Sequence, residues 1–560
     1  MFLLNFIFIV ITFILMFMIL NNKKRTFSEI GNSVIYDRPM IADHLFIVLV
    51  MLGFIIAIFV RVYKFGDIPG SFNQDGAMAA LDAKALGLYG TDRFGMKYPT
   101  HLTAWVYGQM SAMMSYLQIP TIKLFGLTAL GVRLPSLIVS LCGILCLFLF
   151  IHKAFGKNLA LAVLYFAAIN PWHIMQSRWA LEANLYPHFC MIGIYFLYMA
   201  LQTHRRKLNF VISMTFFGLS MYCYGIALYT MPVFLLLTVI LLCKYRKIKI
   251  SEIVLCVISY LAVAWPFITT MLINFLGLET IETPWFTIPY FEHSVRSNDI
   301  LFFAKEPLKQ LVINFTNMVN IILFQGDDHL YNSIPGYGNM YLFTVPFIIL
   351  GIVSMTKRMR YNNASLITVS MFITSVFCGI VTASVNTNRI NIVFYSLMIF
   401  AVIGIYEVFH YFSTKSYVKT MIPVFYLVAF FSFCGFYFTE YPKMVDELFY
   451  VDFKNASEYM SNQDSEIYYI SEDSKDEKYY VSLAEVLTMF YHDIDALYFQ
   501  GKTTDDFGKT YDERYVYFTC GELSEIEPGF YLVTSNDLSK FEDVDHTIET
   551  FGHFYVVNVP

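Results

Sequence analysis

The chain has 560 residues, of which 57% are hydrophobic, 18% aromatic and only 14% charged. A soluble protein of this length would have about 25% charged residues. The apolar residues gather in continuous blocks of about 17–22 residues with almost no charge, which is typical of membrane-spanning helices. An outer-membrane barrel is excluded, because its strands alternate apolar and polar residues.

Apolar blocks recur along the chain as far as Phe438. A membrane-spanning helix needs about 20 mostly apolar residues, and the blocks are close to this length. The sequence therefore predicts a polytopic α-helical membrane protein with about 12 transmembrane helices, near residues 1–20, 43–60, 134–151, 158–172, 185–201, 208–224, 226–243, 252–271, 340–355, 365–382, 392–409 and 420–438.

Basic residues gather in six short gaps between these blocks, and such clusters mark the cytoplasmic side of a membrane protein. The first block has no basic residue before it and no small-residue cleavage site, so we expect a retained span. One orientation then places both termini and the segments at about 61–133 and 272–339 outside. The basic gap residues are Lys23, Lys24, Arg25, Arg38, Lys153, Lys157, Arg205, Arg206, Lys207, Lys244, Arg246, Lys247, Lys249, Lys357, Arg358, Arg360, Lys415 and Lys419.

The formal net charge of −5 conceals two unlike regions. Residues 439–560 hold 26 acidic and 8 basic side chains, whereas residues 1–438 hold 17 acidic and 30 basic ones. Alternating runs rich in Tyr, Phe and Val, at 466–470 and 514–518, predict strands. We therefore predict a membrane module at 43–438, preceded by an extra helix and cytoplasmic loop at 1–42 and followed by an acidic extracytoplasmic α+β domain at 439–560.

The outer loop at about 61–133 is too long and too polar for a linker. In it, Ala77–Leu88 and Thr103–Leu117 are expected to form short interfacial helices. Asp75 follows a Gly/Pro/Asn turn at the start of the first helix, where the helix dipole keeps a carboxylate ionised, as a general base or metal ligand requires. The alternative is that Asp75 only caps the helix.

A second group of polar residues lies at 170–187, where one span reaches the outer surface and the next begins. Arg178, Glu182 and Asn184 are expected at this boundary. Arg178 and Glu182 are four residues apart, so an ion pair within one helix is an alternative to a functional role. His173 is expected in the interfacial aromatic belt.

Two further polar groups lie at the outer ends of spans. Arg389 is the only basic residue between Arg360 and Lys415 and lies on the side where basic residues are uncommon. It therefore needs an anionic partner, either an acidic side chain or a phosphate. The run 325–338 contains acids and a histidine that would either ligate a divalent cation or stay solvated, namely Asp327, Asp328 and His329.

Taken in order, these motifs resemble one family of membrane enzymes. The order is similar to that of bacterial membrane glycosyltransferases of the GT-C superfamily, close to the protein O-mannosyltransferase and aminoarabinose-transferase branch of glycosyltransferase family 39. The resemblance covers about residues 60–400. It is carried by Asp75 and the helix formers after it, Phe125-Gly126, Arg133-Leu134-Pro135-Ser136, Pro171-Trp172-His173, Ser177-Arg178, Glu182 and Asn388-Arg389.

The resemblance implies a GT-C-like membrane module that transfers a sugar, with inversion, from a polyprenyl-phosphate donor at the outer face of the plasma membrane. Asp75 corresponds to the catalytic base, but the family usually has Asp-Glu here and this chain has Gly76. Residues expected to bind the donor phosphate are Arg389, Arg178, Arg133 and Lys97, the last in a weak match of Lys97-Tyr98-Pro99 to the family's Lys-Pro-Pro. Those expected to bind the acceptor or a divalent metal are Glu182, Asn184, Asp327, Asp328 and His329.

The expected partners are the lipid-linked donor, membrane lipid and a cell-envelope glycan, lipid or protein as acceptor, with no nucleic acid. The acidic tail predicts an acceptor that is not a polyanion. The main alternative is a transporter or flippase for lipid-linked sugars, which would have ionisable residues in mid-span. A polysaccharide polymerase, a second alternative, would have several arginines in a late outer loop, where this chain has Arg389.

Overall fold

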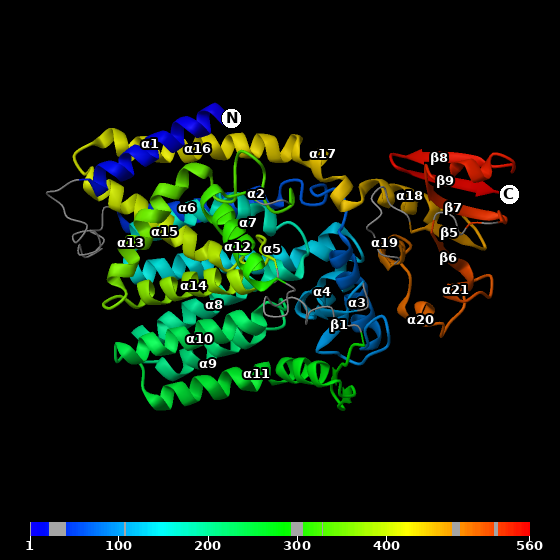
Figure 1. Cartoon of the computed structure of the whole chain (residues 1–560), viewed down its shortest axis with the longest axis horizontal. Coiled ribbons are helices and arrows are strands. Elements are labelled where there is room, and N and C mark those ends of the chain that lie inside the picture. Colours follow the sequence, from blue (N-terminus) through cyan, green and yellow to red (C-terminus); the bar gives the residue numbers. More distant parts are fainter. Residues whose placement is uncertain are drawn as a thin grey trace.

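The structure is a computed structural model that describes residues 2–21, 41–105, 108–292, 306–326, 329–382, 384–472, 482–519, 523 and 525–560. It consists of a long helical bundle with a small β-sheet at one end (Figure 1). The bundle contains α1 (Phe2–Leu20), α2 (Asp43–Val62), α5 (Ala129–Phe155), α6 (Lys157–Ala168), α7 (Pro171–Gln176), α8 (Glu182–Gln202), α9 (Arg206–Ser220), α10 (Ala227–Lys244), α11 (Ile250–Leu276), α12 (Pro307–Val319), α13 (Val345–Arg358), α14 (Asn363–Val381), α15 (Val393–Tyr411) and α16 (Ser416–Thr439).

Each of the twelve apolar blocks overlaps one of these helices. Among the described residues, seven helices are long and apolar enough to cross a membrane: α2, α5, α10, α11, α14, α15 and α16. Two shorter apolar stretches are Asn5–Leu20, within α1, and Lys157–Ala168, which is α6. Helices α9 and α13 have 15 and 14 residues, whereas a span needs about 20. The chain is therefore a helical multi-pass membrane protein, and the number of twelve spans stays a prediction.

Helices α13 and α15 touch through their backbones at two glycines. A methyl group on Gly351 of α13 would lie 1.9 Å from the carbonyl oxygen of Phe400, and one on Gly404 of α15 would lie 1.9 Å from that of Phe347. Apolar burial does not drive helix association in a bilayer, so close packing at small residues is what holds helices together. These glycines therefore fix α15, whose N-terminal end follows the turn that contains Arg389.

The two ends of the bundle differ in what they carry. The connections between α10 and α11 and between α13 and α14, which contain basic residues, lie at the end opposite the sheet (Figure 1). The outer loop and the C-terminal sheet lie together at the other end (Figure 1). This arrangement agrees with the orientation inferred from charge, which stays a prediction because the structure contains no membrane.

The outer loop contains one of the two helices expected there. Helix α3 (Gln74–Tyr89) includes the predicted helix at Ala77–Leu88. The prediction of a helix at Thr103–Leu117 is wrong. Strands β1 (His101–Thr103) and β2 (Gln109–Ser111) form an antiparallel pair whose backbone groups bond across the pair, and the helix that follows, α4 (Met113–Phe125), begins only at Met113. A second short pair, β3 (Ile281–Glu282) and β4 (Thr287–Ile288), lies in the segment at about 272–339.

Residues after α16 form a five-stranded mixed sheet in the order β6-β5-β7-β9-β8. Strand β5 is parallel to β6 and β7, and β9 is antiparallel to β7 and β8. Two of the strands lie where the sequence predicts them, at 466–470 and 514–518. The described elements are α17 (Tyr441–Val445), α18 (Val451–Ser461), β5 (Tyr468–Ser471), α19 (Ser482–Tyr491), α20 (Ala496–Phe499), α21 (Tyr511–Arg514), β6 (Tyr515–Phe518), β7 (Gly529–Thr534), β8 (Thr547–Phe551) and β9 (Phe554–Val559).

This C-terminal region packs directly against the outer loop. The buried rings of Phe490 and Phe72 have centroids 4.9 Å apart. Lys84 of α3 forms an ion pair with Asp493, with Nζ and Oδ1 2.7 Å apart. The hydroxyl of Tyr89, also in α3, donates a hydrogen bond of 2.7 Å to Asp495. The exposed ion pair adds little stability, so we attribute most of the docking free energy to the buried rings.

Candidate functional site

A cavity of about 1110 Å³ lies among several segments that meet at the outer-loop end of the bundle. Its walls come from the start of α3, the β1–β2 pair, the turn between α7 and α8, the end of α11, the turn before α15, and residues 448–450. Four residues expected in a functional site line it: Asp75, Glu182, His329 and Arg389. The fold thus brings together residues from four distant parts of the sequence.

Asp75 lies in the first turn of α3, half-buried in the cavity wall. The residue that caps this helix is Asn73, whose Oδ1 accepts a hydrogen bond of 3.1 Å from the backbone N–H of Gly76. The interpretation of Asp75 as the cap is therefore wrong. Its carboxylate, near the positive end of the helix dipole, can act in the cavity instead.

Gly76 is required by the close approach of α3 to the turn before α8. A Cβ on Gly76 would lie 2.9 Å from the carbonyl oxygen of Ala180 and 3.0 Å from Oδ1 of Asn73. Backbone atoms cannot move aside as a flexible side chain can. The structure therefore leaves no room for a side chain such as Glu at position 76, because its Cβ would collide with the turn.

We expect Gly76→Ala to lower the free energy of unfolding by about 1–3 kcal/mol, because the added methyl group overpacks this contact. Gly87→Ala in the same helix is the matched control. Its Cβ would come 3.3 Å from a methyl group of Ile119, and alanine has the higher helix propensity. Thermal unfolding of the purified variants measures both effects. Equal stability of the two variants would contradict the steric explanation.

Glu182 begins α8 and faces the cavity from the side of the β1–β2 pair. Its Oε2 accepts a hydrogen bond of 2.8 Å from the backbone N–H of Ser111 in β2. The expected alternative, an ion pair with Arg178 on one helix, is wrong because the chain between α7 and α8 is not helical. Glu182 thus brings a second carboxylate to the cavity that Asp75 lines.

Arg389 lies in the turn between α14 and α15 and is half-buried. Its Nη1 donates a hydrogen bond of 3.0 Å to the carbonyl oxygen of Ser384. The same turn is tied to the start of α8, because Nδ2 of Asn391 donates a bond of 2.6 Å to the carbonyl oxygen of Ala183, next to Glu182. The guanidinium is therefore held at the cavity wall by a turn that is fixed to the neighbouring wall.

A row of aromatic rings, absent from the sequence predictions except for His329, forms another part of the wall. The rings of His329 and Tyr331 are stacked with centroids 4.9 Å apart. The ring centroids of Tyr331 and Trp179 lie 5.4 Å apart, and those of Trp179 and Phe449 lie 5.5 Å apart. All four line the cavity. Because isolated aromatic residues near a membrane boundary usually belong to the interfacial belt, only the fold identifies them as one surface.

Arg133 and Arg178, expected to bind phosphate, do not line the cavity. Both side chains are buried, with exposed fractions of 1% and 0%. Arg133 donates four hydrogen bonds of 2.6–3.3 Å to carbonyl oxygens within residues 65–71. Arg178 donates four of 2.7–3.4 Å to carbonyl oxygens within residues 60–68. The two arginines therefore hold the chain that connects α2 to Asp75.

Lys97 and Asn184 do not line the cavity either. Lys97 donates a hydrogen bond of 2.8 Å from Nζ to the carbonyl oxygen of Pro284, at an exposed position. Asn184 is buried and donates to the carbonyl oxygen of Trp179. Asp327 and Asp328 lie outside the described residues.

His173 is wholly buried, so its assignment to the aromatic belt is wrong. Its Nδ1 lies 3.1 Å from Nη2 of Arg61, and its Nε2 lies 3.2 Å from the hydroxyl of Tyr395. That hydroxyl also contacts Nδ1 of His188 at 2.7 Å. This network links α2, α7, α8 and α15, and the sequence indicates it only through lone polar residues in apolar blocks.

Among the described residues, no three His, Cys, Asp or Glu side chains lie close enough together to hold an ion. Asp75, Glu182 and His329 share the cavity without forming such a cluster. The expected metal site stays a prediction, because Asp327 and Asp328 lie outside the described residues.

Known proteins share this sequence and architecture in part. Residues 110–269 match the model of the family described as dolichyl-phosphate-mannose-protein mannosyltransferase. The crystal structure of ArnT from Cupriavidus metallidurans bound to undecaprenyl phosphate superposes with a TM-score of 0.55 at 12% identity, over 93% of this chain and 99% of that one. The chain has a GT-C fold. This confirms the resemblance to GT-C glycosyltransferases of family 39 that the motif order predicts.

The apo crystal structure of the same ArnT shows the GT-C fold as well, with a TM-score of 0.53 at 12% identity over 92% of this chain and 97% of that one. No curated protein sequence matches the chain. The segment that matches the mannosyltransferase family runs from β2 to α11 and contains Glu182, whereas Asp75 and Arg389 lie on either side of it. The cavity is thus built from the matched segment and from both flanking regions.

Proposed function

We propose that the chain transfers a sugar from a polyprenyl-phosphate donor to a cell-envelope acceptor at the outer face of the plasma membrane. The observation that carries this proposal is that Asp75 and Arg389, more than 300 residues apart in the sequence, line one cavity. One is a base and the other a fixed cation, which are the two groups that such a transfer needs. The GT-C fold, and the undecaprenyl phosphate bound to ArnT, support the donor class.

The chemistry assigns one step to each group. Asp75 accepts the proton of an acceptor hydroxyl while its oxygen attacks the anomeric carbon of the donor. The bond between that carbon and the phosphate oxygen breaks, and the electron pair leaves with the polyprenyl phosphate. This leaving group needs no proton at neutral pH, and Arg389 stabilises its charge by charge-assisted hydrogen bonds. A single displacement from the opposite face inverts the anomeric configuration.

The apolar part of the cavity fits the lipid portion of the donor. Leu272 and Phe275 of α11 line the cavity and are 52% and 79% exposed. In a multi-pass protein, exposed apolar side chains on a long apolar helix face the lipid. The polyprenyl chain would therefore leave the cavity past these residues, which leaves its phosphate near the polar walls.

The aromatic row and Glu182 fit the sugar and the acceptor. The carbon-bound hydrogens of a sugar ring pack on aromatic faces, and the row of Trp179, Tyr331 and His329 supplies such faces. Glu182 has one carboxylate oxygen bonded to Ser111, which orients the group toward the cavity. We assign it to binding an acceptor hydroxyl.

The alternative function is a transporter for lipid-linked sugars, which requires ionisable residues between its membrane spans. Arg61 is a residue of this kind. However, Arg61 donates hydrogen bonds of 2.8–3.0 Å to the carbonyl oxygens of Ala57, Ala167 and Ala168. A side chain bonded in this way fixes helices to one another. We therefore assign Arg61 a structural role, which favours the enzyme.

The test is a transfer assay with the protein reconstituted in liposomes and supplied with polyprenyl-phosphate hexoses and cell-envelope extract. We expect one polyprenyl phosphate to be released for each sugar transferred, and the product linkage to have the opposite anomeric configuration to the donor by NMR. Empty liposomes are the control. Movement of intact donor across the bilayer without cleavage, or retention of configuration, would contradict the proposal.

A further inference from the structure

A second, smaller cavity of about 440 Å³ lies in the C-terminal region, away from the membrane helices. We call it the Tyr498 hollow and define it by Tyr468, His492, Tyr498, Thr504, Arg514 and Tyr515, which line it. Its size falls within the range of about 300–1,000 Å³ that is usual for small-ligand pockets. The proposed transfer reaction uses none of these residues.

Aromatic rings form much of the hollow. Tyr468 and Tyr515 are stacked with centroids 5.3 Å apart, and the ring of His492 meets both edge-on at 5.3 and 5.5 Å. Burial and the nearby guanidinium of Arg514 lower the pKa of His492 to about 3, so its ring is neutral. Its Nδ1 pairs with the hydroxyl of Tyr515 at 3.1 Å.

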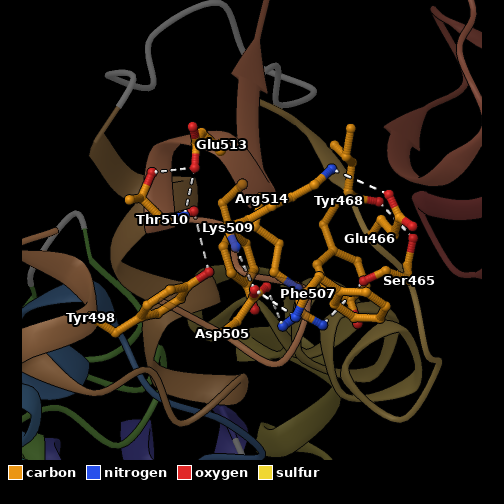
Figure 2. Close-up of polar contacts among 12 residues, drawn as sticks. Ser465, Glu466, Tyr468, Tyr498, Asp505, Phe507, Lys509, Thr510, Glu513 and Arg514 are labelled. Carbon is orange, nitrogen blue, oxygen red and sulfur yellow. Dashed lines mark hydrogen bonds and ion pairs between the residues drawn. The ribbon is translucent and has the colours of Figure 1, made fainter. Parts of the chain in front are cut away.

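Residues 505–509 form a loop at the Tyr498 hollow, and Asp505 fixes this loop (Figure 2). One carboxylate oxygen of Asp505 accepts hydrogen bonds from the backbone N–H groups of Phe507 and Lys509 at 2.9 and 2.8 Å. The other lies 2.9 Å from Nη1 of Arg514, whose Nη2 donates to the carbonyl oxygen of Ser465 at 3.1 Å. The hydroxyl of Tyr498 donates to the carbonyl oxygen of Thr510 at 3.3 Å. A ligand would thus meet a preformed surface, which reduces the entropy lost on binding.

The charges around the hollow argue against an anionic ligand. Its lining includes three aspartates, Asp493, Asp495 and Asp505, against the single base Arg514, which Asp505 already pairs. Residues 439–560 have 26 acidic and only 8 basic side chains.

Tyr468 and Tyr515 are only 3% and 7% exposed and stack on each other, so the half-buried ring of Tyr498 is the tyrosine face more open to a ligand. That ring, together with carboxylates and threonine hydroxyls, suits a polyhydroxylated ligand with flat apolar ring faces. We propose that the Tyr498 hollow binds an uncharged glycan chain.

The Tyr498 hollow lies next to α3, the helix that carries Asp75, and this position indicates a role for a glycan bound there. The loop at 493–495 lines the hollow and also holds α3, through the contacts of Asp493 with Lys84 and of Asp495 with Tyr89. Lys84 and Asp75 are nine residues apart in α3, which is about 14 Å along a helix. A glycan of several sugar units seated in the hollow can therefore extend toward the cavity. Its role as the acceptor rests on the proposed function, whereas its binding does not.

The experiment measures binding of glycans to the full-length protein in nanodiscs, without any donor. Maltoheptaose, mannohexaose and chitohexaose are the neutral probes, poly(glycerol phosphate) is the anionic comparator, and saturation-transfer NMR and calorimetry report binding. We expect at least one neutral probe to bind better than the polyanion. Tyr498→Ala should raise its Kd at least tenfold, and Tyr498→Phe, which keeps the ring, less than threefold.

Thr504→Trp provides a second variant that fills the hollow from an exposed position and so leaves the fold intact. It should also raise the Kd at least tenfold. Tyr417→Ala, in an exposed tyrosine of α16, is the matched control and should leave binding unchanged. Absence of binding by every neutral probe, preference for the polyanion, or unchanged binding by both hollow variants would overturn the proposal. Because no donor is present, these results are independent of whether the protein transfers sugar.

Discussion

Replacing Asp75 with asparagine is expected to lower the rate of sugar transfer by a factor of about 10²–10⁴, the range for removing a general base. Asparagine has nearly the same shape but cannot accept a proton at neutral pH. Because Asn73 caps α3, the substitution leaves the cap intact. It weakens the interaction of the side chain with the helix dipole, which is worth about 0.3–1 kcal/mol. The measurement is the initial rate of transfer at saturating donor, together with the unfolding temperature.

Asp67→Asn is the matched control. Asp67 is an exposed acid of the same outer loop that does not line the cavity, so its replacement should leave the rate within twofold. Donor binding to Asp75→Asn should also stay close to the wild-type value, since the base acts on the acceptor. Full transfer activity in Asp75→Asn would show that another group removes the proton.

The sequence alone could predict where the candidate site lies and several of its members. Charge patterning placed Asp75, Glu182, His329 and Arg389 outside the membrane helices on one side, and the structure brings all four to one cavity. These residues meet at one end of the bundle because each lies at or beyond the end of an apolar block, and whether they act in a reaction stays a prediction. The motif order then added the GT-C fold, which composition could not supply.

The sequence could not separate Arg389 from Arg133 and Arg178, because all three are isolated arginines near the outer ends of spans. An arginine can satisfy its five N–H donors with a phosphate or with backbone carbonyl groups. Which of these occurs depends on whether an irregular segment presents several carbonyl oxygens to it. That is a property of the tertiary structure, as the four bonds from Arg133 to residues 65–71 show.

The prediction of a helix at Thr103–Leu117 is wrong for a related reason. The pairing of β1 with β2 is decided by contacts that the local sequence does not reveal. Ser111 of β2 bonds to Glu182 from a segment about 70 residues away, and His101 and Gln109 line the cavity. The strand pair is therefore held by the site it helps to form.

Replacing Arg133 with methionine is expected to destabilise the protein strongly and to affect donor binding little. Methionine fills the space beside Phe72, whose ring centroid lies 4.9 Å from the guanidinium carbon, but donates no hydrogen bond. Four buried carbonyl oxygens then lose their partner, at about 1 kcal/mol each, so the free energy of unfolding should fall by on the order of 4 kcal/mol. Thermal unfolding measures this loss. The rate of transfer should fall too, because these carbonyl groups belong to the segment that leads to Asp75.

Arg389→Ala is the comparison that separates holding the loop from binding the phosphate. Arg389 is half-buried and its Nη1 donates hydrogen bonds to Ser384 at the exposed end of the turn, so its removal should lower the unfolding temperature much less than the removal of the fully buried Arg133. The apparent KM for the donor should instead rise about 10- to 100-fold, as expected for the loss of a hydrogen bond to a charged group. The two variants should therefore show opposite patterns of stability and donor KM. A raised donor KM with normal stability in Arg133→Met would show that Arg133 binds the phosphate after all, because a residue that only holds the loop cannot change donor affinity without weakening the fold.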